Sequence, residues 1–271
     1  MSGFCKHTID ALDMLKKLGR FLEAGFCGLL ANVDACCPFC GSQAPEADTL
    51  GCMNCLNRLI SINPPICRRC GRPLHNQNSK EAYCSECLSH PRFFSAARAV
   101  GIYDGFLRQA VLSLKFKSHT RLALPMAGWL KETVYKERLQ RSCDLIVPVP
   151  LHPQRLYERG YNQAELLSGN LAALMGRRHA PEALSRINNS VQQSTLTAAG
   201  RAANIRGAFE CLYPGIIAGR KVLLIDDVLT TGSTASECAR VLLKSGCIQV
   251  TVLTVGTVPF EAPDFLCGPG L

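Results

Sequence analysis

From residue 97 onward, segments in which apolar residues have strand-like spacing alternate with segments in which they have helix-like spacing. Short runs rich in β-branched residues predict strands at 97–103, 144–149, 221–228 and 249–257. Segments with a helical apolar period predict helices at 105–116, 122–139, 161–175 and 233–245. Strands that alternate with helices favour an α/β domain with a doubly wound, mainly parallel sheet.

Three segments depart from this alternation. Residues 1–35 carry an amphipathic pattern that predicts a helical segment packed on the body of the protein. Residues 36–91 hold few apolar side chains and many cysteines, so we expect a small module there and the α/β domain at 92–271. Within that domain, 183–208 is polar and rich in Gln, Ser, Thr, Asn and Arg, which is typical of a mobile lid over a site.

The cysteines of the module are paired in sequence. Eight of the 16 cysteines form four Cys-x-x-Cys pairs, namely Cys37/Cys40, Cys52/Cys55, Cys67/Cys70 and Cys84/Cys87. Two such hairpins complete a tetrahedral four-thiolate zinc site, and closed sites of this kind are structural. We therefore predict two structural zinc ions. The repeat favours sequential pairing, first with second and third with fourth, while a cross-braced arrangement stays open.

A second motif follows the apolar run at 221–225 and leads into the helix predicted at 233–245. Asp226 and Asp227 precede a hydroxyl-rich loop, Thr230-Thr231-Gly232-Ser233-Thr234. Such a loop at the carboxyl end of a parallel strand directs backbone N–H groups and the helix dipole at a phosphate-sized anion. Carboxylates repel phosphate, but they accept hydrogen bonds from ribose hydroxyls and help to hold Mg²⁺. The motif therefore describes a ribose 5-phosphate site.

The alternative interpretation is that Ser233 or Thr234 merely caps a helix after two acids that end a strand. A cap needs one such residue, so four hydroxyl-bearing residues around a glycine favour the binding site. The segment resembles the phosphoribosyl pyrophosphate (PRPP) signature of type I phosphoribosyltransferases.

The loop after the strand at 144–149 is the next candidate. Arg155 and Arg159 lie one helical turn apart and offer two guanidinium forks to one pyrophosphate. If this strand neighbours the one at 221–228, both loops emerge at the same sheet edge. We count Leu151 and His152 of this loop among the PRPP-binding positions. An exposed basic helix start is the competing interpretation.

Several motifs in order resemble the ComF/GntX family: the cysteine pairs, Leu114-Lys-Phe-Lys117, Val147-Pro-Val-Pro-Leu-His152, Arg159-Gly-Tyr-Asn-Gln163, Gly207-Ala-Phe209 and the PRPP segment. The resemblance implies a type I phosphoribosyltransferase-like fold behind a zinc finger. It also implies that Asp226 and Asp227 hold ribose, that Thr230 to Thr234 hold the 5-phosphate, and that Arg201 lies on a flexible loop. Some members of that family serve DNA uptake in natural transformation.

Two functions follow as hypotheses. The first is an enzyme that transfers phosphoribose from Mg²⁺–PRPP, with Asp226, Asp227, Arg155, Arg159 and Arg201 as its catalytic residues and an acceptor that the sequence does not identify. The second is a non-catalytic factor that uses PRPP as a ligand and binds single-stranded DNA.

Charge bears on the second hypothesis. The chain has a formal net charge of +9, and residues 92–221 hold 19 Lys and Arg against 8 Asp and Glu. This balance suits a polyanionic ligand or a nucleic-acid backbone. The zinc module adds Arg58, Arg68, Arg69 and Arg72 as candidate DNA contacts. No apolar run reaches about 18 residues, so we expect no membrane span and a cytoplasmic protein. The resemblance to the ComF/GntX family implies the DNA-uptake machinery as a further partner.

Overall fold

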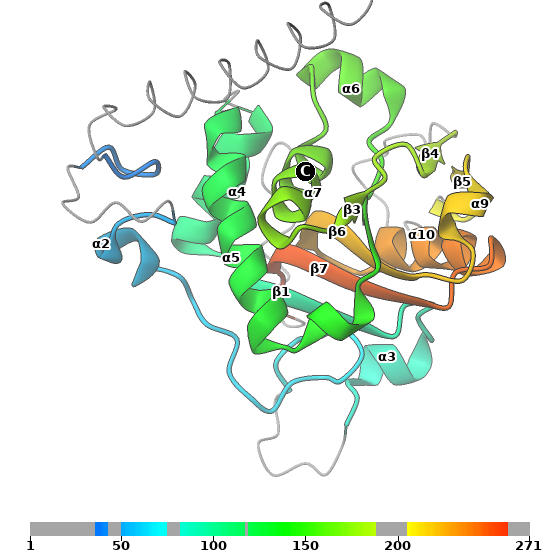
Figure 1. Cartoon of the computed structure of the whole chain (residues 1–271). Helices are drawn as coiled ribbons and strands as arrows, with labels where there is room; N and C mark the ends of the chain where they lie inside the picture. Colours follow the sequence, from blue (N-terminus) through cyan, green and yellow to red (C-terminus); the bar gives the residue numbers. More distant parts are fainter. Residues whose placement is uncertain (1–35, 43–49, 75–81, 117–118, 188–204, 260–271) are drawn as a thin grey trace, which may run out of the picture.

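The computed structural model describes residues 36–42, 50–74, 82–116, 119–187 and 205–259 (Figure 1). The helical segment predicted at 1–35, the middle of the predicted lid and Arg201 lie outside these residues. In the described part of the chain, no helix is both long and apolar enough to cross a membrane.

The core of the molecule is a five-stranded sheet in the order β1-β7-β6-β2-β3, and every neighbouring pair is parallel. Its strands are β1 (Ala96–Ile102), β2 (Leu145–Pro148), β3 (Arg178–His179), β6 (Lys221–Leu229) and β7 (Gln249–Thr257). The apolar runs therefore did identify strands of a parallel sheet. The predicted boundaries of β7 match the observed ones.

Helices cover both faces of this sheet, which confirms the doubly wound arrangement (Figure 1). One face packs on α4 (Gly105–Phe116), α5 (Ala123–Lys136) and α7 (Gln163–Met175). The other packs on α10 (Ser233–Lys244), α9 (Pro214–Ile217) and a ribbon of β4 (Leu184–Arg186) and β5 (Phe209–Cys211). Successive residues of β6 alternate between the faces: Leu223 joins the first core and Leu224 the second.

The structure corrects three details of the sequence interpretation. Residues 153–159, expected as a loop, form the helix α6 (Pro153–Arg159), which starts at a proline whose fixed φ suits the first helical turn. The predicted helix at 122–139 is α5 with 3₁₀ turns at 120–122 and 139–142. The polar segment 183–208 begins and ends in the antiparallel β4–β5 ribbon, because the apolar Leu184 and Phe209 are buried.

The first cysteine module packs on the helices of the core. Phe39 stacks on Trp129 of α5 with ring centroids 4.7 Å apart, and it meets Phe106 of α4 edge to face. The indole Nε1–H of Trp129 donates to the carbonyl of Leu50 at 2.9 Å. This module, which includes α2 (Met53–Leu56), therefore shares the hydrophobic core of the α/β domain.

The chain around the second module, with α3 (Ser85–Ser89), covers the outer edge of β1. The amide of Ala97 donates to the carbonyl of Arg69 at 2.6 Å, and that of Ile102 donates to Ile60 at 2.9 Å. Gly71 has φ +73°, and a Cβ there would lie 2.4 Å from the carbonyl oxygen of Ala97. A glycine is thus required for this close approach, which protects an edge strand that would otherwise expose unpaired amides.

Candidate functional site

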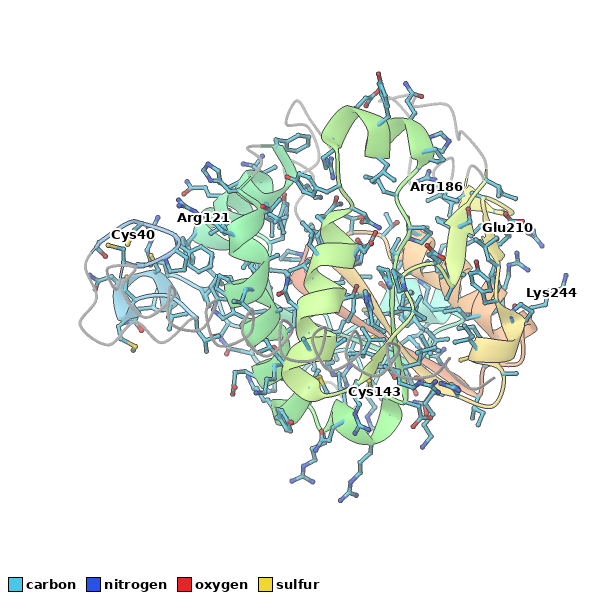
Figure 2. The ribbon with its side chains drawn as sticks, turned by 45° about the horizontal axis from the view of Figure 1, so that its top comes forward. Cys40, Arg121, Cys143, Arg186, Glu210 and Lys244 are labelled. Carbon is cyan, nitrogen blue, oxygen red and sulfur yellow. The ribbon has the colours of Figure 1, made fainter. Side chains whose placement is uncertain are left out.

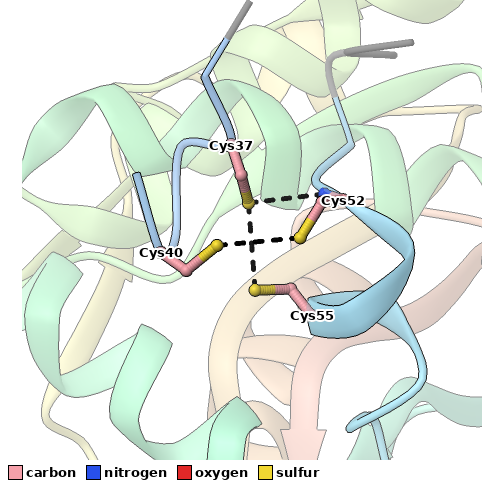
Figure 3. Close-up of side chains that lie close together, drawn as sticks. All are labelled: Cys37, Cys40, Cys52 and Cys55. Carbon is pink, nitrogen blue, oxygen red and sulfur yellow. Dashed lines mark hydrogen bonds between the residues drawn. The ribbon is translucent and has the colours of Figure 1, made fainter. Parts of the chain in front are cut away.

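Two groups of four cysteines form metal-binding geometries. Cys37, Cys40, Cys52 and Cys55 make up one group, and Cys67, Cys70, Cys84 and Cys87 the other, with all ligand sulfurs of a group within 4.8 Å of one another. The sequential pairing is therefore the one that the chain adopts. Figure 3 shows the first group, in which the sulfur–sulfur distances are 3.8 Å for Cys37–Cys55 and 3.6 Å for Cys40–Cys52.

These distances fit zinc. A tetrahedron with Zn–S bonds of about 2.3 Å has sulfur–sulfur edges of about 3.8 Å. The amide of Cys52 donates to the sulfur of Cys37 at 3.3 Å, and the amide of Cys84 donates to Cys67 at 3.4 Å. Backbone amides directed at sulfur stabilise the thiolate form that a metal requires.

The acidity of the second group also suits a cation. Hydrogen bonds with Cys70 and Cys87 lower the pKa of Cys67, while the hydrogen bond with Cys67 raises the pKa of Cys70 to about 12. Crowded thiols lose protons one after another because each thiolate repels the next. A divalent cation at the centre of the group removes this repulsion.

The second candidate site lies at the carboxyl ends of β2 and β6, which are parallel neighbours. Pro148 pairs with Ile225, and the amide of Val149 donates to the carbonyl of Ile225 at 2.9 Å. In the sheet, β2 is followed on its outer side by β3, the next strand in the sequence. On the opposite side, β6 is followed by β7, the next strand after it. Such a reversal leaves a crevice beyond the strand ends where open α/β sheets bind ligands.

Both predicted carboxylates lie inside β6, which continues to Leu229, one residue beyond the strand predicted at 221–228. The strand is longer because Val228 and Leu229 are buried and pair with β7. Asp227 is buried and forms an ion pair with Lys115 at the end of α4, with Nζ and Oδ1 3.1 Å apart. Its second oxygen, Oδ2, is buried with no hydrogen-bond partner among the described residues.

Asp226 is half-buried and lies next to Asp227 in β6. One of its oxygens accepts the amide of Asp227 at 2.8 Å. Burial, followed by the charge of Asp227, raises the pKa of Asp226 to about 7. For Lys115, burial lowers the pKa, but attraction to Asp227, Tyr103 and Asp226 outweighs it and the net shift is upward. The site therefore keeps Lys115 charged opposite Asp227.

The loop at 230–234 leads directly into α10. Gly232 occupies the N-cap position with φ +77°, and no side chain caps the helix. Thr231 and Ser233 are half-buried, and their hydroxyls lie 3.0 Å apart. The alternative in which Ser233 or Thr234 serves as the cap is therefore wrong. The amide of Ser233 donates to Oγ1 of Thr231 at 3.3 Å, and the next N–H groups of this helix start are the ones available to an anion.

Of the two predicted arginines on α6, Arg159 is the one that interacts with a carboxylate of the site. Arg159 stacks over Phe116 at 5.0 Å and bonds to Gln163. Burial lowers the pKa of Arg159, and the opposing attraction of Asp227 indicates that the two groups lie close. His152 instead caps α6, because its Nδ1 accepts the amide of Gln154 at 3.1 Å.

Three residues near this site escaped the sequence interpretation: Lys115, Tyr103 and Arg186. Tyr103 is buried, its hydroxyl has no partner among the described residues, and burial raises its pKa. Burial and the charge of Arg155 lower the pKa of Arg186 on β4, while Asp226 opposes this shift. The Leu114-Lys-Phe-Lys117 motif did contain Lys115, but nothing in the sequence indicated that it would reach Asp227.

The arginines of the cysteine modules have structural contacts. Arg72 is only 6% exposed. Arg69 donates to the carbonyls of Arg92 and Phe94, and Arg58 lies over the ring of Phe106 at 5.1 Å. Among these four predicted DNA contacts, Arg69 and Arg72 are therefore poorly placed to reach a nucleic-acid backbone.

Comparisons with known proteins agree with the two cysteine modules. Residues 33–88 match the model of the double zinc ribbon domain. DNA utilization protein YhgH of Salmonella typhi is 31% identical over 198 residues, which cover 72% of this chain and 85% of the relative. Competence protein F of Haemophilus influenzae is 29% identical and covers 80% of this chain and 94% of its own. Competence protein ComFC of Bacillus subtilis is 29% identical over 210 residues, which cover 74% of this chain and 81% of the relative.

A solved structure of glutamine PRPP amidotransferase from B. subtilis also overlaps the chain. The overlap covers 49% of this chain and 26% of that chain at 15% identity, with a TM-score of 0.34.

Proposed function

Since the chain belongs to the ComF family, we propose that it binds Mg²⁺–PRPP at the carboxyl edge of its sheet, transfers phosphoribose from it and acts in DNA uptake. The observation that supports the proposal most is the buried Asp227, whose Oδ2 has no hydrogen-bond partner in the described part of the chain, at the end of the strand that leads into α10. A buried acceptor of this kind needs a donor, and ribose hydroxyls supply one.

The carboxylates also fit a magnesium ion. Asp226 and Asp227 would hold it through carboxylate oxygens and its bound waters, as hard divalent cations prefer. When bound, Mg²⁺ supplies charge neutralisation to the pyrophosphate. Lys115 already pairs with Oδ1 of Asp227, so Asp226 and Oδ2 of Asp227 remain for the hydroxyls and the ion.

The remaining roles are assigned to residues around the carboxylates. The amides and hydroxyls of 230–234 would hold the 5-phosphate. Arg155 and Arg159 would bind and stabilise the departing pyrophosphate. Arg201, which lies outside the described residues, keeps its proposed role in shielding the reacting carbon from water. The two zinc ions would be structural and hold the cysteine modules on the domain.

Titration calorimetry tests PRPP binding. We expect the wild type to bind PRPP only with Mg²⁺, and Asp226→Ala/Asp227→Ala to lose binding because the hydroxyls and the ion lose their acceptors. A matched control, Glu132→Ala/Glu182→Ala, removes two exposed carboxylates elsewhere and should bind as the wild type does. Equal affinity in the wild type and the Asp226/Asp227 variant would remove the ribose assignment.

The second candidate is a non-catalytic role in which PRPP is only a ligand and the protein binds single-stranded DNA. The observation that favours it is the excess of 19 Lys and Arg over 8 Asp and Glu in residues 92–221. Release of pyrophosphate from PRPP in the presence of a panel of nucleobases separates the two. Release that depends on one base supports transfer, whereas binding without release supports the ligand role.

A further inference from the structure

The end of the sheet opposite the candidate PRPP site carries a group of cations. We define the amino-edge basic patch as Lys136, Arg138, Arg141, Arg177, Arg178 and Lys221. The first five are exposed and Lys221 is half-buried. They come from the end of α5, the 3₁₀ turn that follows it, and the starts of β3 and β6.

Contacts between these elements bring the six residues to one surface. Nη2 of Arg177 donates to the carbonyl of Gln140 at 3.4 Å, and Nζ of Lys221 donates to the carbonyl of Arg141 at 3.3 Å. In the sheet, Arg178 pairs with Leu145, which pairs in turn with Val222. Arg178 and Lys221, 43 positions apart in the sequence, are thereby placed on β3 and β6, the two strands that flank β2.

The charge of this surface is largely uncompensated. Glu137 is committed to Arg98, with Nε and Oε2 2.8 Å apart. Asp144 accepts the backbone amide of Lys221 at 2.9 Å. Within the described ranges, no carboxylate forms an ion pair with any of the six patch residues. Clustered cations of this kind create a positive potential that attracts a polyanion.

An aromatic ring accompanies the cations. Tyr135 precedes Lys136 on α5 and is 49% exposed. The amide of Arg138 donates to the carbonyl of Tyr135. Arg138 has φ +56°, a backbone conformation that few residues other than glycine and asparagine adopt readily. An arginine therefore occupies a position where glycine would be less strained, next to an exposed ring.

We propose that the amino-edge basic patch binds the phosphate backbone of single-stranded DNA and that Tyr135 stacks on one of its bases. A row of cations beside an exposed aromatic ring is the arrangement by which proteins hold single strands without reading their sequence. The choice of DNA as the polyanion rests on the DNA-related function proposed above. The location of the surface comes from the structure.

This surface is distinct from the candidate PRPP site. Lys221 begins β6 and Asp226 lies five residues further on, which corresponds to about 16 Å along a strand. In Figure 2, Cys143, next to the patch, lies in the lower half of the molecule and Arg186, near the PRPP site, in the upper half. The patch also differs from the predicted DNA contacts of the cysteine modules, where Arg69 and Arg72 are engaged or buried.

Fluorescence anisotropy of a labelled oligonucleotide tests the proposal with metal-loaded, full-length protein. Arg141→Glu/Arg178→Glu should weaken binding at least tenfold and lower the slope of log K against log salt by about 1.4, because two phosphate contacts are lost. Tyr135→Ala should weaken binding severalfold, whereas Tyr135→Phe should bind as the wild type does, since stacking needs only the ring.

The matched control is Arg121→Glu/Lys244→Glu, which reverses two exposed cations elsewhere (Figure 2). We expect it to bind DNA within about twofold of the wild type. If it loses as much affinity as the patch variant, the contribution of the patch is only that of net charge and the proposal is wrong. Absence of binding by the wild type at low salt overturns it as well.

Two further measurements separate this proposal from its neighbours. Arg141→Glu/Arg178→Glu should bind Mg²⁺–PRPP as the wild type does, so failure of the PRPP assignment and failure of the patch are distinguishable. Vesicles of phosphatidylserine and phosphatidylcholine test the alternative partner. If the patch variant loses vesicle binding but keeps DNA binding, the surface is a lipid contact and the proposal is overturned.

Discussion

At the scale of single residues, the pair of Lys115 and Asp227 determines the character of the candidate PRPP site. Their side chains are 11% and 6% exposed. A charge this deeply buried is stable only with a partner, because transfer from water costs several kcal/mol per ion. The ion pair with Lys115 therefore compensates the charge of Asp227 and fixes the position of its Oδ1.

Removal of one member of this pair tests that role. Lys115→Met should lower the free energy of unfolding by about 3 kcal/mol, since Asp227 is left as a buried, unpaired charge. Lys115→Met/Asp227→Leu should recover much of the loss, and urea denaturation measures both. Lys136→Met, at an exposed site, should change stability by no more than about 0.5 kcal/mol. Additive losses in the double variant would contradict the pairing.

The acidity of Asp226 predicts how PRPP binding depends on pH. Burial and the charge of Asp227 raise its pKa to about 7. A proton on Asp226 displaces the ribose hydroxyls and Mg²⁺, so affinity should be constant above about pH 7 and fall about tenfold per unit below it. Calorimetry between pH 5.5 and 8 checks this. In Asp226→Asn, any remaining pH dependence of the affinity reports the titration of PRPP itself. If this variant shows the same dependence of affinity on pH as the wild type, Asp226 is not the group responsible.

At the scale of elements, the two cysteine modules differ in what they hold. Phe39 of the first module stacks on Trp129, and Leu50 packs on the same core. The second module approaches β1 through the backbone of Arg69 and Gly71. Loss of metal should therefore disturb α4 and α5 in one case and the edge of the sheet in the other.

Trp129 distinguishes these outcomes because it is the sole tryptophan of the chain. Cys52→Ser should shift its fluorescence to longer wavelength, since the first module no longer covers the ring. Cys84→Ser should release zinc but leave Trp129 emission unchanged. Cys36→Ser replaces an exposed cysteine outside both groups and serves as the control. Identical emission in all three variants would show that the first module does not depend on its metal.

At the scale of the whole molecule, the modules and the sheet form one packed unit with two charged ends. The carboxyl edge gathers Asp226, Asp227 and the arginines of α6. The amino edge gathers Lys221 and Arg178. The parallel sheet produces this division, because all of its strands start at one edge and end at the other.

The pure protein should contain about two zinc ions per chain, because eight thiolates complete two sites. Elemental analysis measures the ratio, and a thiol reagent should leave the eight cysteines unmodified until a chelator is added. A protein that contains no zinc and whose eight thiols react freely would rule out both sites.

The sequence by itself determined the local features of this protein. The period of apolar residues located β1, β2, β6 and β7, because a buried parallel strand requires a continuous apolar run. The spacing of the cysteine pairs predicted two metal sites, since two thiols of a Cys-x-x-Cys hairpin can reach one ion. The sequence also placed Asp226 and Asp227 before the hydroxyl-rich loop at 230–234.

Only the tertiary structure decided which distant residues meet. Cys-x-x-Cys spacing leaves the partner of each pair open, and the sequential grouping follows from the folded path of the chain. Lys115 reaches Asp227 across 112 positions because α4 packs on the face of the sheet where Leu223 and Ile225 of β6 are buried. The amino-edge basic patch likewise forms because strand order places β2 between β3 and β6. Periodicity reports which side of an element is buried, whereas packing between elements determines what each buried or exposed side contacts.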